Sequence, residues 1–141
     1  MKRFLNPAIA VVVLLALVFS FAGCADNSAT GLWENAVYQN DTQLGEGSKT
    51  ITVKVEAEEK TVTFTVKTDK ETVGEALTEN SLVEGDMGEY GLYIKKVNGI
   101  LADYSVDMSY WSFYINGEMA STGVDGAKID ETAVYSLVYT K

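Results

Sequence analysis

The stretch Tyr110-Trp111-Ser112-Phe113-Tyr114-Ile115-Asn116-Gly117-Glu118-Met119-Ala120 decides the fold, because it predicts two strands joined by a tight turn. Aromatic and β-branched residues fill the run before the turn, and such residues favour strands. Asn116-Gly117 is a strong hairpin signal, since a type I′ turn needs positive φ at both central residues. Alternation places Trp111, Phe113 and Ile115 on one face of the first strand.

Two alternating segments lie earlier in the chain. Residues 50–56 and 61–67 place Val, Ile and Phe on one side and Thr, Lys and Glu on the other. A period of two is typical of strands that bury one face and expose the other. The polar rows are expected to form a solvated outer face, and we assign them no chemistry.

The period changes after these two strands. Thr72 and Glu75 fit a capping box, in which each residue satisfies a backbone N–H of the other. Val73 and Leu77 share one helical face, which predicts a short helix that packs across the sheet. We expect this helix to end near Asn80.

The remaining segments predict loops and further strands. Residues 84–89 carry three carboxylates and two glycines and are expected to form an acidic loop, and residues 103–110 a loop with two tyrosines. Residues 91–102 predict a strand with a second turn signal, Asn98-Gly99. Residues 133–139 are partly apolar on both faces, which is typical of a central strand. Strands, a short helix and more strands together predict an α+β domain.

The order of these motifs is similar to that of a known family. In chain order, the sequence has a strand with Asn98-Gly99, a Tyr/Asp loop, the hairpin at residues 110–118 and then Gly123-Val124-Asp125. This order resembles that of the DUF4430 family, over roughly residues 50–141. The fold of that family is like the C-terminal β-domain of transcobalamin and intrinsic factor. The resemblance implies a β-grasp, ubiquitin-like fold, with a mostly antiparallel sheet and one short helix.

The N-terminus has the pattern of a bacterial lipoprotein signal. Lys2 and Arg3 precede an apolar run over residues 8–21, as in a secretory signal peptide. Phe21-Ala22-Gly23-Cys24 resembles a lipobox, although Leu is usual where Phe21 stands. Cys24 is the only cysteine and has no intramolecular disulfide partner, so we expect it to carry a diacylglyceryl group that anchors the protein in the bilayer. An uncleaved signal anchor is the alternative.

These signals divide the chain into three parts. We expect a lipoprotein signal peptide at residues 1–23, a lipid-anchored and partly ordered tether at residues 24–48, and the DUF4430-like domain at residues 49–141. Trp33 and Tyr38 do not suit a flexible linker, so they are expected to pack onto the domain. The expected location is the extracytoplasmic face of the cell membrane.

Composition excludes several functions. Without Lys2 and Arg3, the 11 basic residues fall to 9 against 20 acidic ones, so the mature chain would have a formal charge of −11. The clustered Lys or Arg that nucleic acids require are missing. The sequence has no His. It therefore cannot form a Ser-His-Asp triad, a Cys-His catalytic pair or a His/Cys zinc site. We expect no enzymatic activity, no nucleic-acid partner and no metal site.

The resemblance also implies a ligand. In transcobalamin-like proteins the β-domain covers one face of a corrinoid such as cobalamin, and a helical barrel holds the other face. This sequence contains no such barrel, so a dimer or a partner protein is expected to complete the site. The carried-over candidates for ligand contact lie in the aromatic segment and its hairpin: Tyr104, Tyr110, Trp111, Tyr114, Asn116 and Met119.

Two alternatives stay open at this point. Trp111, together with Phe113 and Ile115, equally suits the core of the domain, in which case it contacts no ligand. The domain also suits a cell-surface interaction or adhesion module, since tyrosine-rich loops bind proteins as well as small molecules. An aromatic cleft would favour a small molecule, and a flat patch or an open strand edge would favour an envelope protein.

Overall fold

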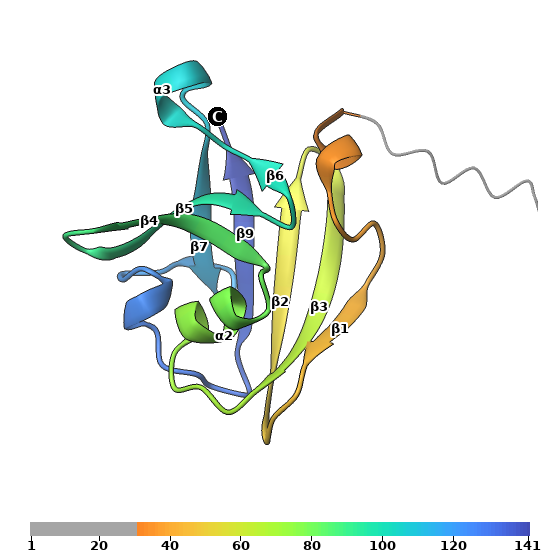
Figure 1. The fold of residues 1–141 in the computed structure, drawn as a ribbon, viewed down its shortest axis with the longest axis vertical. Helices are drawn as coiled ribbons and strands as arrows, with labels where there is room; N and C mark the ends of the chain where they lie inside the picture. Colours follow the sequence, from red (N-terminus) through yellow and green to blue (C-terminus); the bar gives the residue numbers. More distant parts are fainter. Residues whose placement is uncertain (1–30) are drawn as a thin grey trace, which may run out of the picture.

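The computed structural model describes residues 31–141, which form two β-sheets connected by short helical segments (Figure 1). The predicted signal peptide, Cys24 and residues 25–30 of the predicted tether lie outside the described residues. Within residues 31–141, no helix is both long and apolar enough to cross a membrane.

Strands dominate the described chain, and each helical segment is short. In chain order the elements are the 3-10 helix η2 (Gly31–Asn35), β1 (Thr42–Gly45), β2 (Lys49–Ala57), β3 (Lys60–Thr68), α2 (Val73–Glu79), β4 (Val83–Gly88), β5 (Gly91–Val97), β6 (Ile100–Leu101), α3 (Tyr104–Asp107), β7 (Tyr110–Ile115), β8 (Glu118–Met119), the 3-10 helix η3 (Val124–Gly126) and β9 (Val134–Thr140). The architecture is therefore mostly β, with α2 as the longest helix of the described residues at seven residues.

The larger sheet has six strands in the order β1-β3-β2-β9-β7-β8. β9 runs parallel to β2 and antiparallel to β7, so the last strand of the chain is central, as its two partly apolar faces predict. β1 adds a second parallel pairing at the edge, beside β3. The sheet is therefore mixed, whereas the smaller sheet, β4-β5-β6, is antiparallel throughout.

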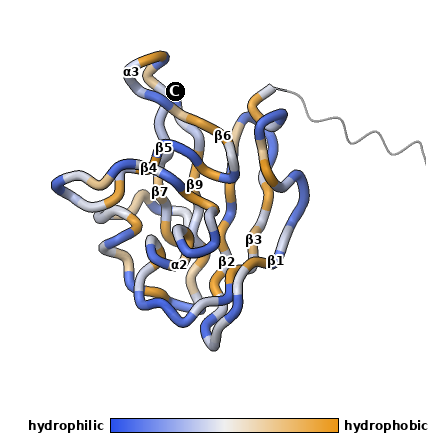
Figure 2. Tube along the Cα trace, in the orientation of Figure 1, coloured by the Kyte–Doolittle hydropathy of each residue, from blue (hydrophilic) through white to orange (hydrophobic). Residues whose placement is uncertain are grey.

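One face of the larger sheet is covered by the rest of the domain. In Figure 1, α2 and the smaller sheet lie in front of this face, and α2 buries Val73, Ala76 and Leu77. Figure 2 shows hydrophobic and hydrophilic residues alternating along β2 and β3, and their burial follows the same alternation. Removal of this apolar face from water is the main source of stability. Its fully buried side chains include Ile51, Val53, Val55, Phe64, Val66 and Leu137.

The predicted turns and the predicted helix start are confirmed. Asn98-Gly99 has φ values of 51° and 82° and joins β5 to β6, and Asn116-Gly117 has 52° and 82° and joins β7 to β8. Asparagine tolerates this left-handed conformation because its short polar side chain can hydrogen-bond locally. In the capping box, the Thr72 hydroxyl accepts from the Glu75 N–H at 3.2 Å, and the Glu75 carboxylate accepts from the Thr72 N–H at 3.1 Å.

The acidic loop predicted at residues 84–89 is wrong, because Val83–Gly88 form β4 and pair with β5. Salt bridges to β5 hold the carboxylates: Lys96 Nζ lies 3.4 Å from Glu84, and Lys95 Nζ lies 2.8 Å from Asp86. The register between β4 and β5 shifts after Glu84, which pairs with Lys96, whereas Gly85 pairs with Ile94. Lys95 is therefore an extra residue in β5, as in a β-bulge. Opposite charges across the strands stabilise a segment whose own composition favours a loop.

The loop predicted at residues 103–110 also contains regular structure. Tyr104–Asp107 form one helical turn, α3, and the Asp103 side chain caps it by accepting from the Ser105 N–H at 3.0 Å. Met108 ends the turn in the left-handed region, with φ of 64°. Asp and Ser side chains readily make such local bonds, which is why a short segment rich in them forms a capped turn.

The segment before β1 packs onto the domain, as the sequence indicates for Trp33 and Tyr38. We call residues 31–38 the strap. Trp33 is 2% exposed, and its Nε1–H donates to the Ala57 carbonyl at 2.9 Å. The buried side chain of Asn98 accepts from the Tyr38 N–H and donates to the Tyr38 carbonyl, each at 2.9 Å. The strap is thus fixed at the end of β2 and at the β5–β6 turn.

Candidate functional site

The structure divides the six ligand-contact candidates into three places. Tyr104 and Tyr110 meet at the start of β7, with ring centroids 6.3 Å apart. Tyr114 and Met119 are cross-strand neighbours at the other end of β7, beside the turn residue Asn116. Tyr110 and Tyr114 are four positions apart along β7, which corresponds to about 13 Å in a strand. The candidates on the surface therefore lie in two separate groups along β7.

Trp111 belongs to the core, which is the alternative that the sequence leaves open. Its side chain is buried, its Nε1–H donates to the Ile100 carbonyl at 3.2 Å, and its ring meets Tyr139 edge-on with centroids 5.6 Å apart. Phe113 on the same face stacks with the buried ring of Tyr135. Trp111 thus links β7 to β6 of the smaller sheet, and the ring pairs link β7 to β9.

The turn candidate Asn116 has a structural bond of its own. Its side-chain oxygen accepts from the Val134 N–H at 2.9 Å, which joins the hairpin to the start of β9. Met119 beside it is 67% exposed. Of this group, only Tyr114 and Met119 present side chains that a ligand could cover without breaking a bond of the fold.

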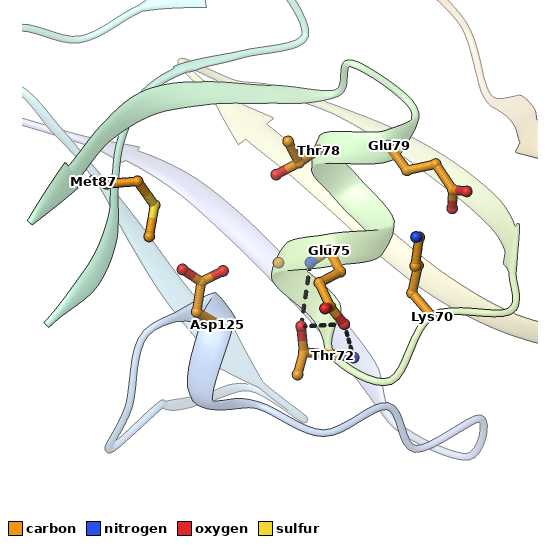
Figure 3. A pocket seen from close by; sticks show the side chains of 8 residues that line it. Lys70, Thr72, Glu75, Thr78, Glu79, Met87 and Asp125 are labelled. Carbon is orange, nitrogen blue, oxygen red and sulfur yellow. Dashed lines mark hydrogen bonds between the residues drawn. The ribbon is translucent and has the colours of Figure 1, made fainter.

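A hollow lies elsewhere, between α2, β4 and η3 (Figure 3). It has a volume of about 620 Å³, and we call it the α2 groove. Figure 3 shows Met87 of β4 opposite Thr78 of α2, with Asp125 of η3 between them. Its lining residues are Lys70, Thr72, Gly74, Glu75, Thr78, Glu79, Met87 and Asp125.

Gly74 and Asp125 set the walls of the α2 groove. Gly74 is buried in the first turn of α2, where a Cβ would collide with the Asp125 carboxylate. The other carboxylate oxygen of Asp125 accepts from the Leu92 N–H at 2.8 Å. Asp125 therefore links η3 to β5 while it lies against α2, and the absence of a side chain at Gly74 permits this approach.

The carboxylates of the α2 groove are held by bonds within the fold. Glu75 completes the capping box, Glu79 accepts from the Thr68 hydroxyl at 3.0 Å, and Asp125 accepts from β5. Lys70 makes no salt bridge within residues 31–141. Its ammonium and the exposed Thr78 hydroxyl are therefore the polar groups best placed to meet a ligand.

Backbone and side-chain hydrogen bonds from Thr72 hold the pKa of Glu75 below its ordinary value of 4.5. A depressed pKa means that ionised Glu75 stabilises the folded state above pH 4.5, and that this contribution disappears as the pH falls through the folded pKa. We expect Glu75→Gln to lower the thermal unfolding midpoint at pH 7, with the difference from the unmodified protein narrowing below pH 4.5. Glu118→Gln on exposed β8 is the matched control; an equal pH-dependent effect there would contradict the assignment.

The α2 groove is not among the sequence predictions. Gly74 is the residue that could have indicated it, because a glycine just inside a capping box weakens a short helix unless another element needs the space. The sequence predicts a loop at Met87, and Asp125 lies far away in the chain. No periodic pattern brings these residues together, since the contact between η3 and α2 is tertiary.

Within residues 31–141, no group of three or more Asp, Glu, His or Cys side chains is placed to hold a metal ion. The aspartates at residues 103, 107 and 130 instead accept bonds from the Ser or Thr two residues later. These bonds hold the pKa of each aspartate below its ordinary value. They are turn-stabilising contacts.

Comparison with known proteins identifies the family. The family model described as "Domain of unknown function (DUF4430)" matches residues 70–133. A solved candidate metal-binding protein from Ruminococcus gnavus ATCC 29149 is 32% identical, with a TM-score of 0.63, over 67% of this chain and 98% of that protein. The chain belongs to the DUF4430 family. The comparison with curated proteins gives no match.

A second solved structure relates the fold to transcobalamin-like proteins. Haptocorrin in complex with Cbi (cobinamide) superposes with a TM-score of 0.51 at 20% identity, over 66% of this chain. The chain spans 25% of the length of haptocorrin. At this identity the likeness concerns the fold, and it agrees with the β-domain that the sequence motifs resemble.

Proposed function

We propose that the chain is a non-enzymatic, extracytoplasmic binding lipoprotein whose α2 groove holds part of a small molecule. The volume of the groove carries this proposal. At about 620 Å³ it falls within the range of ligand pockets, roughly 300–1,000 Å³. Met87 and the methylenes of Lys70 offer apolar contact, and the Lys70 ammonium and Thr78 hydroxyl offer polar contact.

A corrinoid, cobalamin or cobinamide, is the ligand that we favour. The shared fold with haptocorrin supports it. So does the strand order β3-β2-β9-β7-β8 with β9 parallel to β2, which fits a β-grasp arrangement. The groove can take only an edge of such a macrocycle, so a second copy or a partner protein would cover the rest. With no His in the sequence, no protein imidazole could replace the lower cobalt ligand.

A binding role without catalysis suits the groove chemistry. Catalytic carboxylates need a free oxygen and a tuned pKa near the operating pH. The three carboxylates of the groove accept structural hydrogen bonds, and the pKa of Glu75 is lowered rather than raised. Cys24, once acylated, would hold the domain at the outer face of the membrane.

A protein-interaction module is the second candidate, and a separate observation favours it. Large apolar side chains lie exposed around α3, and exposed apolar patches often mark interaction sites. This surface contains two of the ligand candidates, Tyr104 and Tyr110, but not the α2 groove.

The test uses the mature lipoprotein purified from membranes and titrated with cobalamin and cobinamide, followed by calorimetry and by corrinoid absorbance. Tryptophan fluorescence is a weak reporter, because Trp33 and Trp111 are both buried away from the groove. We expect saturable binding. Thr78→Tyr should fill the groove and weaken binding about tenfold or more, equivalent to about 1.4 kcal/mol.

Thr65→Tyr, the same substitution on the outer face of β3, is the matched control and should leave binding unchanged. Loss of binding in Tyr110→Ala or Tyr114→Ala, with Thr78→Tyr unaffected, would move the site to the aromatic hairpin. No binding up to millimolar concentrations of either corrinoid would overturn the corrinoid proposal.

A further inference from the structure

An exposed apolar surface surrounds α3, and we call residues 101–110 the α3 tip. Five large side chains of the tip are between 38% and 79% exposed: Leu101, Tyr104, Val106, Met108 and Tyr110. Half of the residues in this short segment therefore present apolar surface to the solvent. Single exposed apolar residues are ordinary. Here five lie within ten residues and the Tyr104 and Tyr110 rings contact each other, as is typical of a contact surface.

The α3 tip is held in shape by its own polar residues. Asp103 caps the first turn of α3, and Asp107 accepts from the Ser109 N–H at 3.1 Å. Ser109 is buried, and its hydroxyl also accepts from the Asp103 N–H at 3.1 Å. The apolar side chains thus project from a bonded scaffold, so a partner would not have to order the segment first.

The tip lies at the end of the domain where the described chain begins. Figure 1 shows η2 and α3 at the same end of the long axis, with the β1–β2 turn at the opposite end. η2 contacts β6, and β6 leads into α3 after two residues. Residues 25–30 separate Cys24 from Gly31, a span of at most about 25 Å when fully extended.

Charge opposes contact between this end and a membrane less than the acidic chain as a whole would suggest. Asp107 pairs with Lys141 at 3.5 Å, so one of the two negative charges of the tip is accompanied by a positive one. Asp103 accepts hydrogen bonds from the Ser105 N–H and hydroxyl. Tyrosine rings with polar tips also suit the region between the lipid headgroups and the acyl chains.

We propose that the α3 tip contacts the interfacial region of the bilayer that holds the lipid anchor. The inference rests on the proposed acylation of Cys24, which would keep the end carrying η2 close to the membrane. The anchor supplies most of the affinity, and the short connection raises the effective concentration of the tip at the surface. The contact would orient the domain, with the β1–β2 turn pointing away from the membrane.

The mature lipoprotein offers a direct test, since a thioether at Cys24 leaves an added cysteine as the sole free thiol. Val106→Cys is labelled with the fluorophore NBD, and the protein is reconstituted into phosphatidylcholine vesicles. Insertion of the tip should shift the NBD emission to the blue. A nitroxide on the upper acyl chain should quench this emission about twofold more strongly than that of a label exposed to water. Glu46→Cys, in the exposed β1–β2 turn, is the matched control and should show neither effect.

The outcomes separate the inference from its premise. If the unmodified lipoprotein takes up NBD at Cys24, the anchor is absent, and both the lipoprotein assignment and the membrane contact fail. If it does not, but Val106→Cys behaves like Glu46→Cys, the membrane contact alone is overturned. A blue shift that needs added envelope proteins would also overturn it and would assign the tip to a protein partner.

Discussion

Trp33→Ala is expected to lower the free energy of unfolding of the mature protein by about 3 kcal/mol, at the lower end of the usual cost of removing a buried aromatic ring. Trp33 is almost fully buried, and its indole N–H satisfies the carbonyl of Ala57 at the end of β2. Lys60 Nζ also lies 4.8 Å from the ring centroid. The substitution removes the buried ring, its hydrogen bond to Ala57 and its contact with Lys60. The fluorescence of Trp111 follows unfolding in urea.

Trp33→Phe is the matched variant, because it keeps a ring in the cavity and loses the indole bond. We expect it to retain more than half of the lost stability. If the strap detaches before the sheet unfolds, the loss of stability in Trp33→Ala cannot exceed the free energy with which the strap docks. A loss below about 1 kcal/mol, a value typical of surface positions, would contradict a structural role for the strap.

Asn98→Ala should cost about 3 kcal/mol, from two unsatisfied backbone groups and an unfavourable backbone conformation. The Asn98 side chain is 1% exposed and makes both of its bonds to Tyr38. Alanine removes both bonds and must also adopt a φ of 51°. Urea unfolding gives the change in stability, and hydrogen exchange at the Tyr38 amide shows whether the strap is released.

The second Asn-Gly turn supplies the control. Asn116 has nearly the same φ, 52°, but is exposed and makes one side-chain bond to β9. Asn116→Ala should therefore cost about 1.5 kcal/mol, the sum of a weak bond and the turn conformation. Asn98→Gly keeps the turn and loses only the side chain, so it should fall between the two alanine variants. Equal costs at residues 98 and 116 would contradict the role of Asn98 as a link to the strap.

Local patterns predicted most of the fold. Several signals specify their own geometry within a few residues, and each forms as expected. They are the alternation in residues 50–56 and 61–67, the Thr72–Glu75 box and both Asn-Gly turns. The apolar faces of residues 133–139 also indicated a central strand, although not which strands would flank it. These signals are strong because burial and backbone conformation act on neighbouring residues.

Features that depend on distant partners were missed. Glu84 and Asp86 look like loop residues until Lys95 and Lys96 of β5 pair with them. The α2 groove depends on the approach of η3 to Gly74, which no pattern in the sequence specifies. The six ligand candidates are close in sequence, but strand geometry sends Trp111 inward and separates the rest along β7.

The central position of β9 has a consequence for how the protein acquires its structure. β9 follows every other strand of the larger sheet in the sequence, yet its pairing of Val134 with Thr52 joins the two halves of that sheet. Closing the loop between residues 52 and 134 has an entropic cost that slows folding, and contacts so distant in sequence form late. The strands β1-β3-β2 and β7-β8 therefore stay unjoined until β9 has been synthesised. A truncation within β9 would leave two half-sheets with open edges.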